Sequence, residues 1–438
     1  DVDSEISMVS KLMKERHAVS EFGEMFRVIK HISHVPNYKK YFLLNNISMC
    51  KPKPLSERRL VNFDKVCTNF HDINKKNISK YIDTLSILNM PFGGKNMKKF
   101  WNLWSNQYHK HHHRQLQFGD HRMEKFNNMF IKINNALVDM LVHGIVAMNK
   151  KRFYHFDMKD ANVLYIYLTK KGVETTKISS CEYTKNEYSF RVKMIDWGLS
   201  GVFEKRIPDI VVNRPFQYNV PFSSVLFIKD LPGVFKNLCQ RYENENMNDN
   251  NKMLLVAEDL IDYIIDTFGD GHINKIYDMV HKSIMYANRF GIDVPKTPKG
   301  MVAQYLKTVL MKYKNKNNGL DMLSYFRDVY SKNVDVWGFL HIYEKLMGIN
   351  LNLKFKVTDI LLKYCYLPHY AVTPIPIKRI VKKLKSLNSL DRTKLEKYNK
   401  LISYSIRKHT HTTSHRTKKS AKFARSAKSA KSKTYKIP

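Results

Sequence analysis

The 438-residue chain has few cysteines and few acidic residues, and it lacks a long apolar run. Its five cysteines show no CxxC spacing, which argues against a disulfide framework or a zinc site and favours reduced thiols in a cytosol-like compartment. No stretch of about 18 uninterrupted apolar residues occurs, so we expect no membrane span. A hydrophobic fraction of 43% with 12% aromatic residues is typical of a globular protein.

The shortage of acids leaves a large positive charge. Asp and Glu total 39 against 75 Lys and Arg, a formal net charge of +36. Three explanations stay open: a polyanionic partner such as nucleic acid, an acidic substrate, or a general bias toward Lys and Asn in the source genome.

Two cationic segments need separate treatment. Residues 407–438 hold eleven Lys and Arg and no acid, with repeated Ser-Ala-Lys, so we expect residues 391–438 to form a disordered basic arm. Such an arm either binds nucleic acid or another polyanion without specificity, or serves solubility or targeting. A histidine cluster at positions 109 and 111–113 fits a metal site less well than a solvated loop, because no second ligand set accompanies it.

Apolar spacing divides the remaining chain into strands and helices. Period-two runs predict strands at residues 9–13 and 85–88, and a hairpin from residues 163–168 and 190–195. Apolar residues three and four apart predict helices over residues 18–32, 123–149, 254–268 and 334–347. The sequence therefore indicates an α+β protein.

The strongest chemical pattern is HFDMKDAN, from His155 to Asn162, between a predicted helix and a strand. Asp157 can orient a hydroxyl and accept its proton, and Lys159 can neutralise a moving phosphoryl group. Asn162 can hold a metal ion. The plain alternative is a polar loop that caps a helix.

A second acidic residue follows the predicted hairpin. Asp196 ends an apolar strand and is followed by Trp197 and Gly198, and the glycine allows a sharp backbone turn. A carboxylate there can bridge Mg²⁺ to the phosphates of a nucleotide. Alone this pattern is an ordinary turn; after the His155–Asn162 loop it indicates a second metal ligand.

Together these motifs resemble the protein kinase superfamily. HFDMKDAN is similar to His-Arg-Asp-Leu-Lys-x-x-Asn, and Asp196-Trp197-Gly198 is similar to Asp-Phe-Gly. The resemblance implies a two-lobed kinase-like α+β fold: a truncated N-lobe and hinge in residues 1–92, a mainly helical C-lobe in residues 93–390 with a large helical insertion at residues 222–332, and the basic tail. Within that superfamily, the bias toward Lys and Asn and the segment MPFGG (residues 90–94) resemble kinases of giant DNA viruses.

The resemblance also implies a nucleotide site. Lys11 corresponds to the strand lysine that holds the α- and β-phosphates, and Glu24 to its ion-pair partner, with Glu21 as the competing candidate. Residues 88–94, with Asn89 and Met90, correspond to the hinge that receives adenine. Downstream, residues 335–338 (DVWG) resemble the helix start that supports the catalytic loop from below.

Several features depart from the family pattern. The Gly-rich loop should precede Lys11 by more residues than the sequence provides, so either the first strands are missing or ATP is held without that lid. Phe156 replaces the usual Arg, so we expect no control through a phosphorylated activation segment. Pro91 removes one hinge N–H, and Pro221-Phe222-Ser223 stands where Ala-Pro-Glu is usual.

The sequence thus predicts a Ser/Thr protein kinase that uses ATP and Mg²⁺, with protein substrates and no membrane partner. Ser/Thr specificity is favoured because Lys159 lies two residues after Asp157. The alternatives are a small-molecule kinase of the aminoglycoside or choline type and a pseudokinase scaffold that binds polyanions. We expect a cytoplasmic location, which for a viral protein means the host cytoplasm or the virion.

Overall fold

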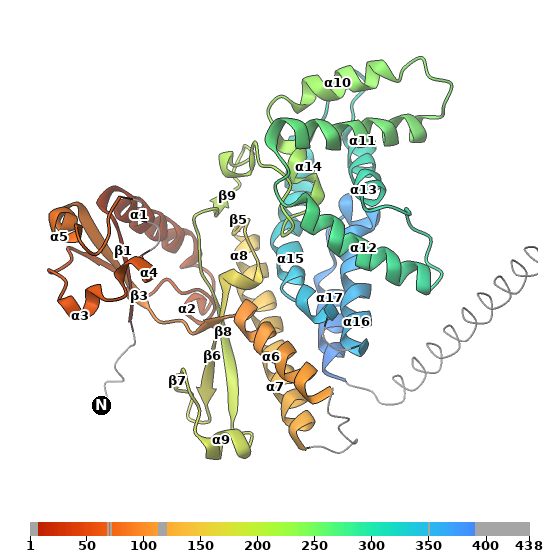
Figure 1. Cartoon of the computed structure of the whole chain (residues 1–438). Coiled ribbons are helices and arrows are strands. Elements are labelled where there is room, and N and C mark those ends of the chain that lie inside the picture. The colour runs from red at the N-terminus through yellow and green to blue at the C-terminus, as the bar shows by residue number, and fades with distance from the viewer. Residues whose placement is uncertain (1–7, 68–69, 71, 113–120, 349–350, 390–438) are drawn as a thin grey trace, which may run out of the picture. The chain divides into compact units, whose positions relative to one another are not determined.

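The computed structural model describes residues 8–67, 70, 72–112, 121–348 and 351–389 (Figure 1). Contacts divide the chain into two units, Asp1–Asn388 and Ser389–Pro438. The predicted basic tail at residues 391–438 lies outside the described residues, as does His113 of the histidine cluster. All elements below belong to the first unit, which mixes helices with small antiparallel sheets and so confirms the α+β class.

The N-terminal part contains a three-stranded antiparallel sheet with the order β1-β3-β2. Its strands are β1 (Met8–Lys14), β2 (Ser48–Cys50) and β3 (Leu85–Pro91), and Lys11 pairs with Leu88. Helix α1 (Glu15–Ile32) follows β1 and packs on this sheet. Short helices connect the strands: α2 (Tyr38–Tyr41), α3 (Glu57–Leu60), α4 (Phe63–Val66) and α5 (Ile78–Tyr81).

The predicted strand and helix at this end are confirmed, but only some of the apolar residues that indicate the helix are buried. Val19 and Phe26 of α1 are each 51% exposed, whereas Ala18, Val28 and Ile32 are buried. The apolar residues of α1 cover more than one face, and the sequence spacing does not tell which of them meets the fold.

The predicted hairpin is confirmed. β6 (Val163–Thr169) pairs with β8 (Tyr188–Met194), and β4 (Lys95–Asn96) and β7 (Glu174–Thr175) join the same sheet. Helix α9 (Ser180–Thr184) lies in the connection. A separate two-stranded pair, β5 (Phe153–Tyr154) with β9 (Gly201–Val202), brackets the two predicted catalytic segments along the chain.

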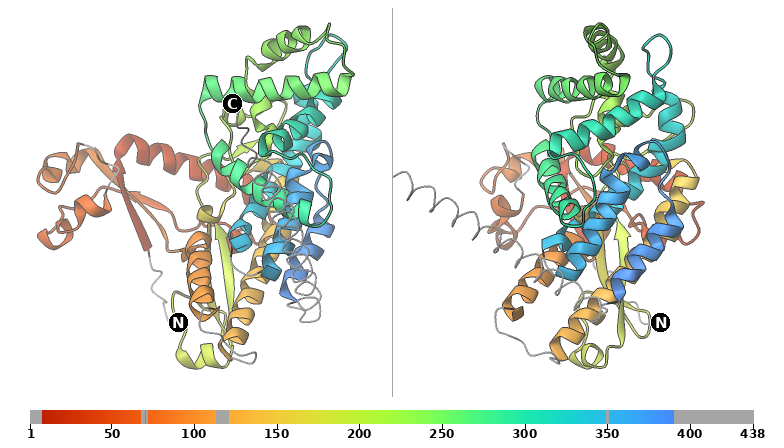
Figure 2. Two further views of the ribbon diagram at one scale, coloured as in Figure 1. Left: turned by 45° about the vertical axis from the view of Figure 1, so that its right-hand side comes forward. Right: turned by 90° about the vertical axis from the view of Figure 1, so that its right-hand side faces the viewer.

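Helices build the rest of the unit, and α11 lies beside α10 and α13 (Figure 2). Their bounds are α6 (Met97–His112), α7 (His121–Asp139), α8 (Val146–Lys150), α10 (Leu231–Arg241), α11 (Asp249–Phe268), α12 (Ile273–Arg289), α13 (Pro298–Tyr313), α14 (Met322–Tyr325), α15 (Ser331–His341), α16 (Leu351–Leu361) and α17 (Ile377–Lys385). A π-helical turn (Met140–Ile145) joins α7 to α8, and the predicted helix over residues 334–347 ends earlier, at His341.

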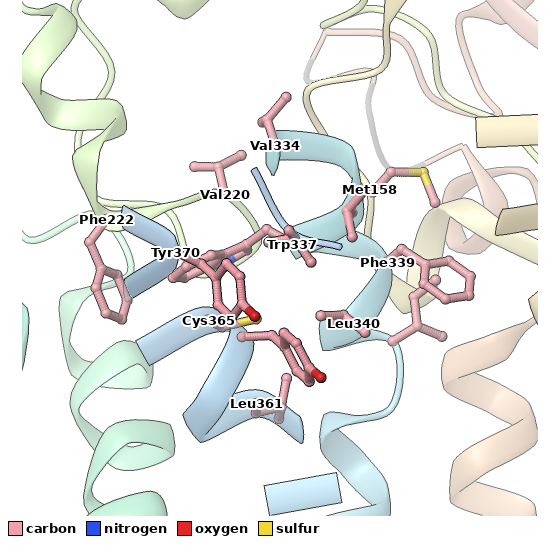
Figure 3. Packing of buried hydrophobic residues seen from close by; sticks show 14 of the residues in the cluster. Met158, Val220, Phe222, Val334, Trp337, Phe339, Leu340, Leu361, Cys365 and Tyr370 are labelled. Carbon is pink, nitrogen blue, oxygen red and sulfur yellow. The ribbon is translucent and has the colours of Figure 1, made fainter. Parts of the chain in front are cut away.

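One large apolar core runs through the helical part. The buried side chains around α15 include Trp337, Phe339 and Leu340, which pack near Phe222 and Cys365 (Figure 3). Residues of α11, α12 and α13 belong to the same core, so the segment at residues 222–332 packs into this core.

Helix Asn127–Lys150 is long and apolar enough to cross a membrane, but half of that stretch is buried in the fold, as in a core helix.

Candidate active site

The loop from His155 to Asn162 is held in place by the buried carboxylate of Asp335. Asp335 Oδ2 accepts from His155 N at 3.0 Å, and Asp335 Oδ1 accepts from Phe156 N at 2.9 Å. Phe156 adopts a φ of 57°, a left-handed conformation that is costly for a bulky residue. Burial raises the pKa of the Asp335 carboxyl, and the two N–H donors act in the opposite direction. The expectation that residues 335–338 support the loop is confirmed.

Helix α15, which carries Asp335, makes a second, closer contact with the loop. A Cβ atom at Gly338 would lie 2.5 Å from Met158 O and 2.8 Å from Asn219 O. Real Cβ atoms do not approach backbone oxygens so closely, so only glycine lets α15 come this near. Trp337 Nε1 also donates to Tyr218 O at 3.4 Å.

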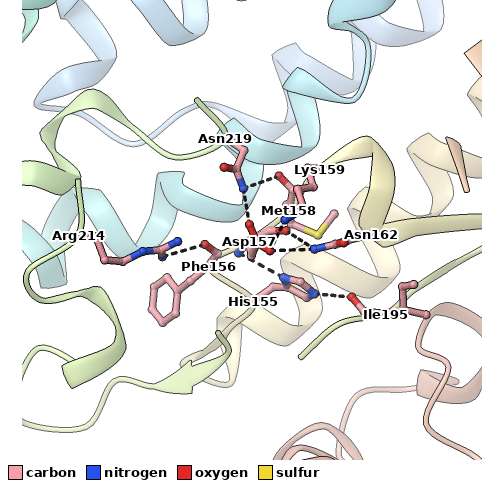
Figure 4. Close-up of polar contacts among 9 residues, drawn as sticks. All are labelled: His155, Phe156, Asp157, Met158, Lys159, Asn162, Ile195, Arg214 and Asn219. Carbon is pink, nitrogen blue, oxygen red and sulfur yellow. Dashed lines mark hydrogen bonds and ion pairs between the residues drawn. The ribbon is translucent and has the colours of Figure 1, made fainter. Parts of the chain in front are cut away.

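The Asp157 carboxylate is the centre of the polar network (Figure 4). Asp157 Oδ2 accepts from Lys159 Nζ at 2.7 Å and from Asn162 Nδ2 at 3.0 Å. Asp157 Oδ1 accepts from Asn219 Nδ2 at 2.9 Å, and that amide also donates to Met158 O at 3.2 Å. With only 6% of the residue exposed, three donors fix the orientation of a nearly buried carboxylate.

The role of Asn219 was missed from the sequence. It lies 62 residues after Asp157, and no local spacing links the two positions. Its only sequence signal is an amide in a short apolar segment that the fold buries, with Val220 and Phe222 following it.

His155 links this loop to the second acidic residue. Its Nδ1 accepts from Asp157 N at 3.3 Å, so its Nε2 carries the proton and donates to Ile195 O at 3.0 Å. The ring is fully buried and lies 4.8 Å from the Trp197 ring, centroid to centroid. The position of Asp196 therefore depends on the tautomer and packing of His155.

Asp196 stands on the turn that follows β8, with a φ of 67° and an exposed side chain. Trp197 beside it is buried against Phe42, and Ser200 closes the turn by donating its N–H to Trp197 O at 2.8 Å. The left-handed backbone at Asp196 is uncommon for a residue with a side chain. Such conformations concentrate at functional sites.

A cleft of about 670 Å³ connects the predicted nucleotide and metal residues. Its lining includes Lys11, Glu24, Met90, Asn162 and Asp196, and its apolar part comes from side chains such as Val9, Leu43 and Leu164. A cleft of this size suits a nucleotide-sized ligand.

Three predicted residues do not line this cleft. The Asn89 amide is used within the sheet, where its oxygen accepts from Ser10 Oγ at 2.7 Å and its nitrogen donates to Cys50 Sγ at 3.5 Å. Asp157 and Lys159 are absent from the cleft lining, but both are joined to it through Asn162, which hydrogen-bonds Asp157 and lines the cleft.

The predicted ion pair between Lys11 and Glu24 is wrong. Lys11 Nζ contacts the Glu21 carboxylate at 2.7 and 3.0 Å, so the competing candidate takes this place. Glu24 lies one turn further along α1, where its Oε1 accepts from Ser20 Oγ at 3.5 Å and its Oε2 faces Gly198. Residues three apart share one helix face, so both acids line the cleft, but Lys11 reaches only the nearer one.

The donor set suits a hard cation. Asn162 Nδ2 donates to Asp157 O and to Asp157 Oδ2, which leaves the Asn162 amide oxygen for a ligand. That oxygen and the Asp196 carboxylate are the types of ligand that Mg²⁺ prefers, and Mg²⁺ completes its shell with water and phosphate. Among the described residues, no group of three or more His, Cys, Asp and Glu could hold a metal ion.

Comparison with known proteins adds nothing to this picture: no family model matches the chain, and no curated protein matches it.

Proposed function

We propose that this protein transfers the γ-phosphate of ATP, with Mg²⁺, to a Ser or Thr hydroxyl of a protein substrate. The observation that carries the proposal is that Asn162, immediately before β6, and Asp196, shortly after its partner strand β8, line the same cleft as Lys11. Phosphoryl transfer uses oxygen ligands for Mg²⁺ and a cationic side chain for the phosphates. One cleft of nucleotide size contains both kinds of group.

In this proposal the cleft binds the triphosphate and the loop performs the transfer. Lys11, oriented by Glu21, holds the α- and β-phosphates. Bound Mg²⁺, held by Asn162 and Asp196, would neutralise the charge of the phosphates. These groups position the γ-phosphate before any covalent change occurs.

Asp157 then orients the substrate hydroxyl. The three donors around its carboxylate hold it in one orientation, so it can accept the hydroxyl proton late in the transfer. Lys159, at 2.7 Å from Asp157, lies where its ammonium group can stabilise the charge of the moving phosphoryl group.

The arrangement of the chain is compatible with a two-lobed kinase-like fold. The β1–β3 sheet with α1 would form the smaller lobe and supply Lys11 and Glu21, and the helical part would supply the catalytic loop. The chain between them is tightly fitted: Gly94 has a φ of 103°, and a Cβ atom there would lie 2.0 Å from Tyr165 O. Met90, on the cleft side of this connection, would contact adenine.

The test is Mg²⁺-dependent ATP turnover by the full chain with a generic Ser/Thr protein substrate. Asp157→Asn keeps the size of the side chain and is expected to lower turnover at least 100-fold, because it removes the proton acceptor. Asp209→Asn is the matched control: Asp209 is exposed, pairs only with Arg206 within the described residues, and is expected to leave turnover unchanged. Equal turnover in wild type and Asp157→Asn would refute the proposal.

The same assay separates the alternatives. Transfer to an aminoglycoside or to choline, without transfer to protein, would indicate a small-molecule kinase. ATP binding without turnover, together with salt-sensitive binding of a polyanion, would indicate a pseudokinase scaffold.

A further inference from the structure

The loop between α11 and α12 packs on the segment that leads to Asn219, which in turn holds Asp157. His272 N donates to Phe216 O at 2.8 Å. Gly271, with a φ of 51°, approaches so closely that a Cβ atom would lie 2.5 Å from Phe216 O. The start of α12 therefore packs on residues 215–219, the segment that ends in Asn219 and its bond to Asp157.

This contact brings the Lys275 ammonium group and the His272 imidazole beside the proposed site of transfer. Lys275 Nζ lies 3.2 Å from the centroid of the Tyr218 ring, and the His272 ring lies 5.2 Å from the same ring. His272 is close enough to Asp157 and Lys159 to interact with both electrostatically.

The cations near α12 outnumber the acids that could balance them. Glu344 and Asp160 raise the pKa of Lys275 through space, and Lys345 and Lys98 lower it to a smaller extent. Lys159 and Arg214 act on the neighbouring His272, and Asp157 is the acid that acts on it in the opposite direction. Burial lowers the pKa of Lys275, and burial together with Lys275 and Lys159 lowers the pKa of His272. An anion placed here would relieve this repulsion.

From this juxtaposition we propose that Lys275 and His272 form a subsite for an anionic side chain, a carboxylate or a phosphate, next to the Ser or Thr that accepts the phosphoryl group. The inference rests on the proposed function, since Asp157 marks the position of the accepting hydroxyl. His272 is near enough to Asp157 for their charges to interact, so the anionic residue would be close in sequence to the accepting residue. An extended peptide advances about 3.3 Å per residue, and positions within three residues of the hydroxyl are therefore the ones to test. Preferred substrates are then acidic or already phosphorylated protein segments.

The experiment measures both binding and transfer for three peptides that share one Ser and differ only at positions within three residues of it: Ala, Glu or phosphoserine. Binding of fluorescent peptides to the full chain gives the preference independently of turnover. We expect wild type to bind the Glu and phosphoserine peptides about tenfold more tightly than the Ala peptide, which corresponds to about 1.4 kcal/mol. The ratio between the Glu and phosphoserine peptides tells which anion the subsite favours.

The variants separate this subsite from the general positive charge of the protein. Lys275→Gln is expected to reduce the preference about fivefold or more, and Lys275→Arg to restore most of it. Lys282→Gln removes the same charge from the same helix at an exposed residue that pairs with Asp278 at 2.6 Å, and it is expected to leave the preference unchanged. Equal binding of the three peptides by wild type would overturn the inference, as would an equal loss of preference in Lys275→Gln and Lys282→Gln. A preference that persists without any phosphoryl transfer would refute the proposed function and leave the subsite supported.

Discussion

Replacing Gly338 by alanine tests the contact between α15 and the loop from His155 to Asn162 most directly. The added Cβ atom would meet Met158 O at 2.5 Å, Met158 Cβ at 2.7 Å and Asn219 O at 2.8 Å. Two of these three neighbours are backbone atoms, which cannot rotate away. The helix and the loop must therefore separate.

The cost can be worked out from these distances. Overpacking a filled core costs about 1–3 kcal/mol, and contacts below 3.0 Å with two carbonyl oxygens place this site at the upper end. Alanine recovers up to about 1 kcal/mol through its higher helix propensity. The net loss of unfolding free energy is about 2 kcal/mol. Because Met158 and Asn219 hold Asp157, a displacement of their segments is expected to lower turnover about 10- to 100-fold.

Urea unfolding followed by circular dichroism measures the stability, and ATP turnover measures the displacement. Gly233→Ala is the control, because Gly233 also lies in a helix, α10, but a Cβ atom there meets nothing within 4 Å. That variant is expected to be up to about 1 kcal/mol more stable than wild type and equally active. If Gly338→Ala behaved like Gly233→Ala in both assays, the close approach of α15 to the loop would be wrong.

Three further predictions test other parts of the structure. Burial lowers the pKa of His341 from 6.5 to about 4, so the contribution of the neutral ring to stability is complete above pH 6.5 and is lost as the pH falls toward 4. Wild type therefore loses unfolding free energy between pH 7 and pH 5, and His341→Gln should lose about 2 kcal/mol less. Urea unfolding at both pH values measures the difference. Glu21→Gln should raise the KM for ATP about tenfold and Glu24→Gln much less, and the reverse order would restore the pairing of Lys11 with Glu24. Gly94→Ala should destabilise the protein more than Gly172→Ala, because both glycines have positive φ but only Gly94 meets a backbone oxygen, at 2.0 Å; equal thermal shifts would contradict this contact.

Short-range patterns were enough to predict much of the fold. The β6–β8 hairpin, β1, and the helices α1 and α11 follow from apolar spacing within about 20 residues. The residues on the cleft were also predictable where a motif carries them: Asn162 and Asp196 each lie within a few residues of the strand that positions them.

What the sequence left open depends on contacts over long distances. Glu21 and Glu24 lie on the same face of α1, so only the position of β1 relative to that helix decides which one meets Lys11. Asn219 reaches Asp157 through a segment held by Trp337 and His272, and no local pattern encodes such a three-way contact. The exposed Val19 and Phe26 show that local spacing also does not predict which apolar residues of a helix are buried.

Because the backbone at Asp196 is left-handed, selection for stability and selection for the proposed activity favour different residues at this position. Glycine at this position would relieve roughly 1–2 kcal/mol of conformational cost, and because the side chain is exposed, its removal would leave no cavity. At Phe156, which has a similar φ, the buried ring outweighs that gain, since deleting a buried phenylalanine costs about 3–5 kcal/mol. A library screened for thermal stability alone should therefore enrich glycine at position 196 and retain phenylalanine at position 156, and the most stable clones would lack the carboxylate that the proposed chemistry requires.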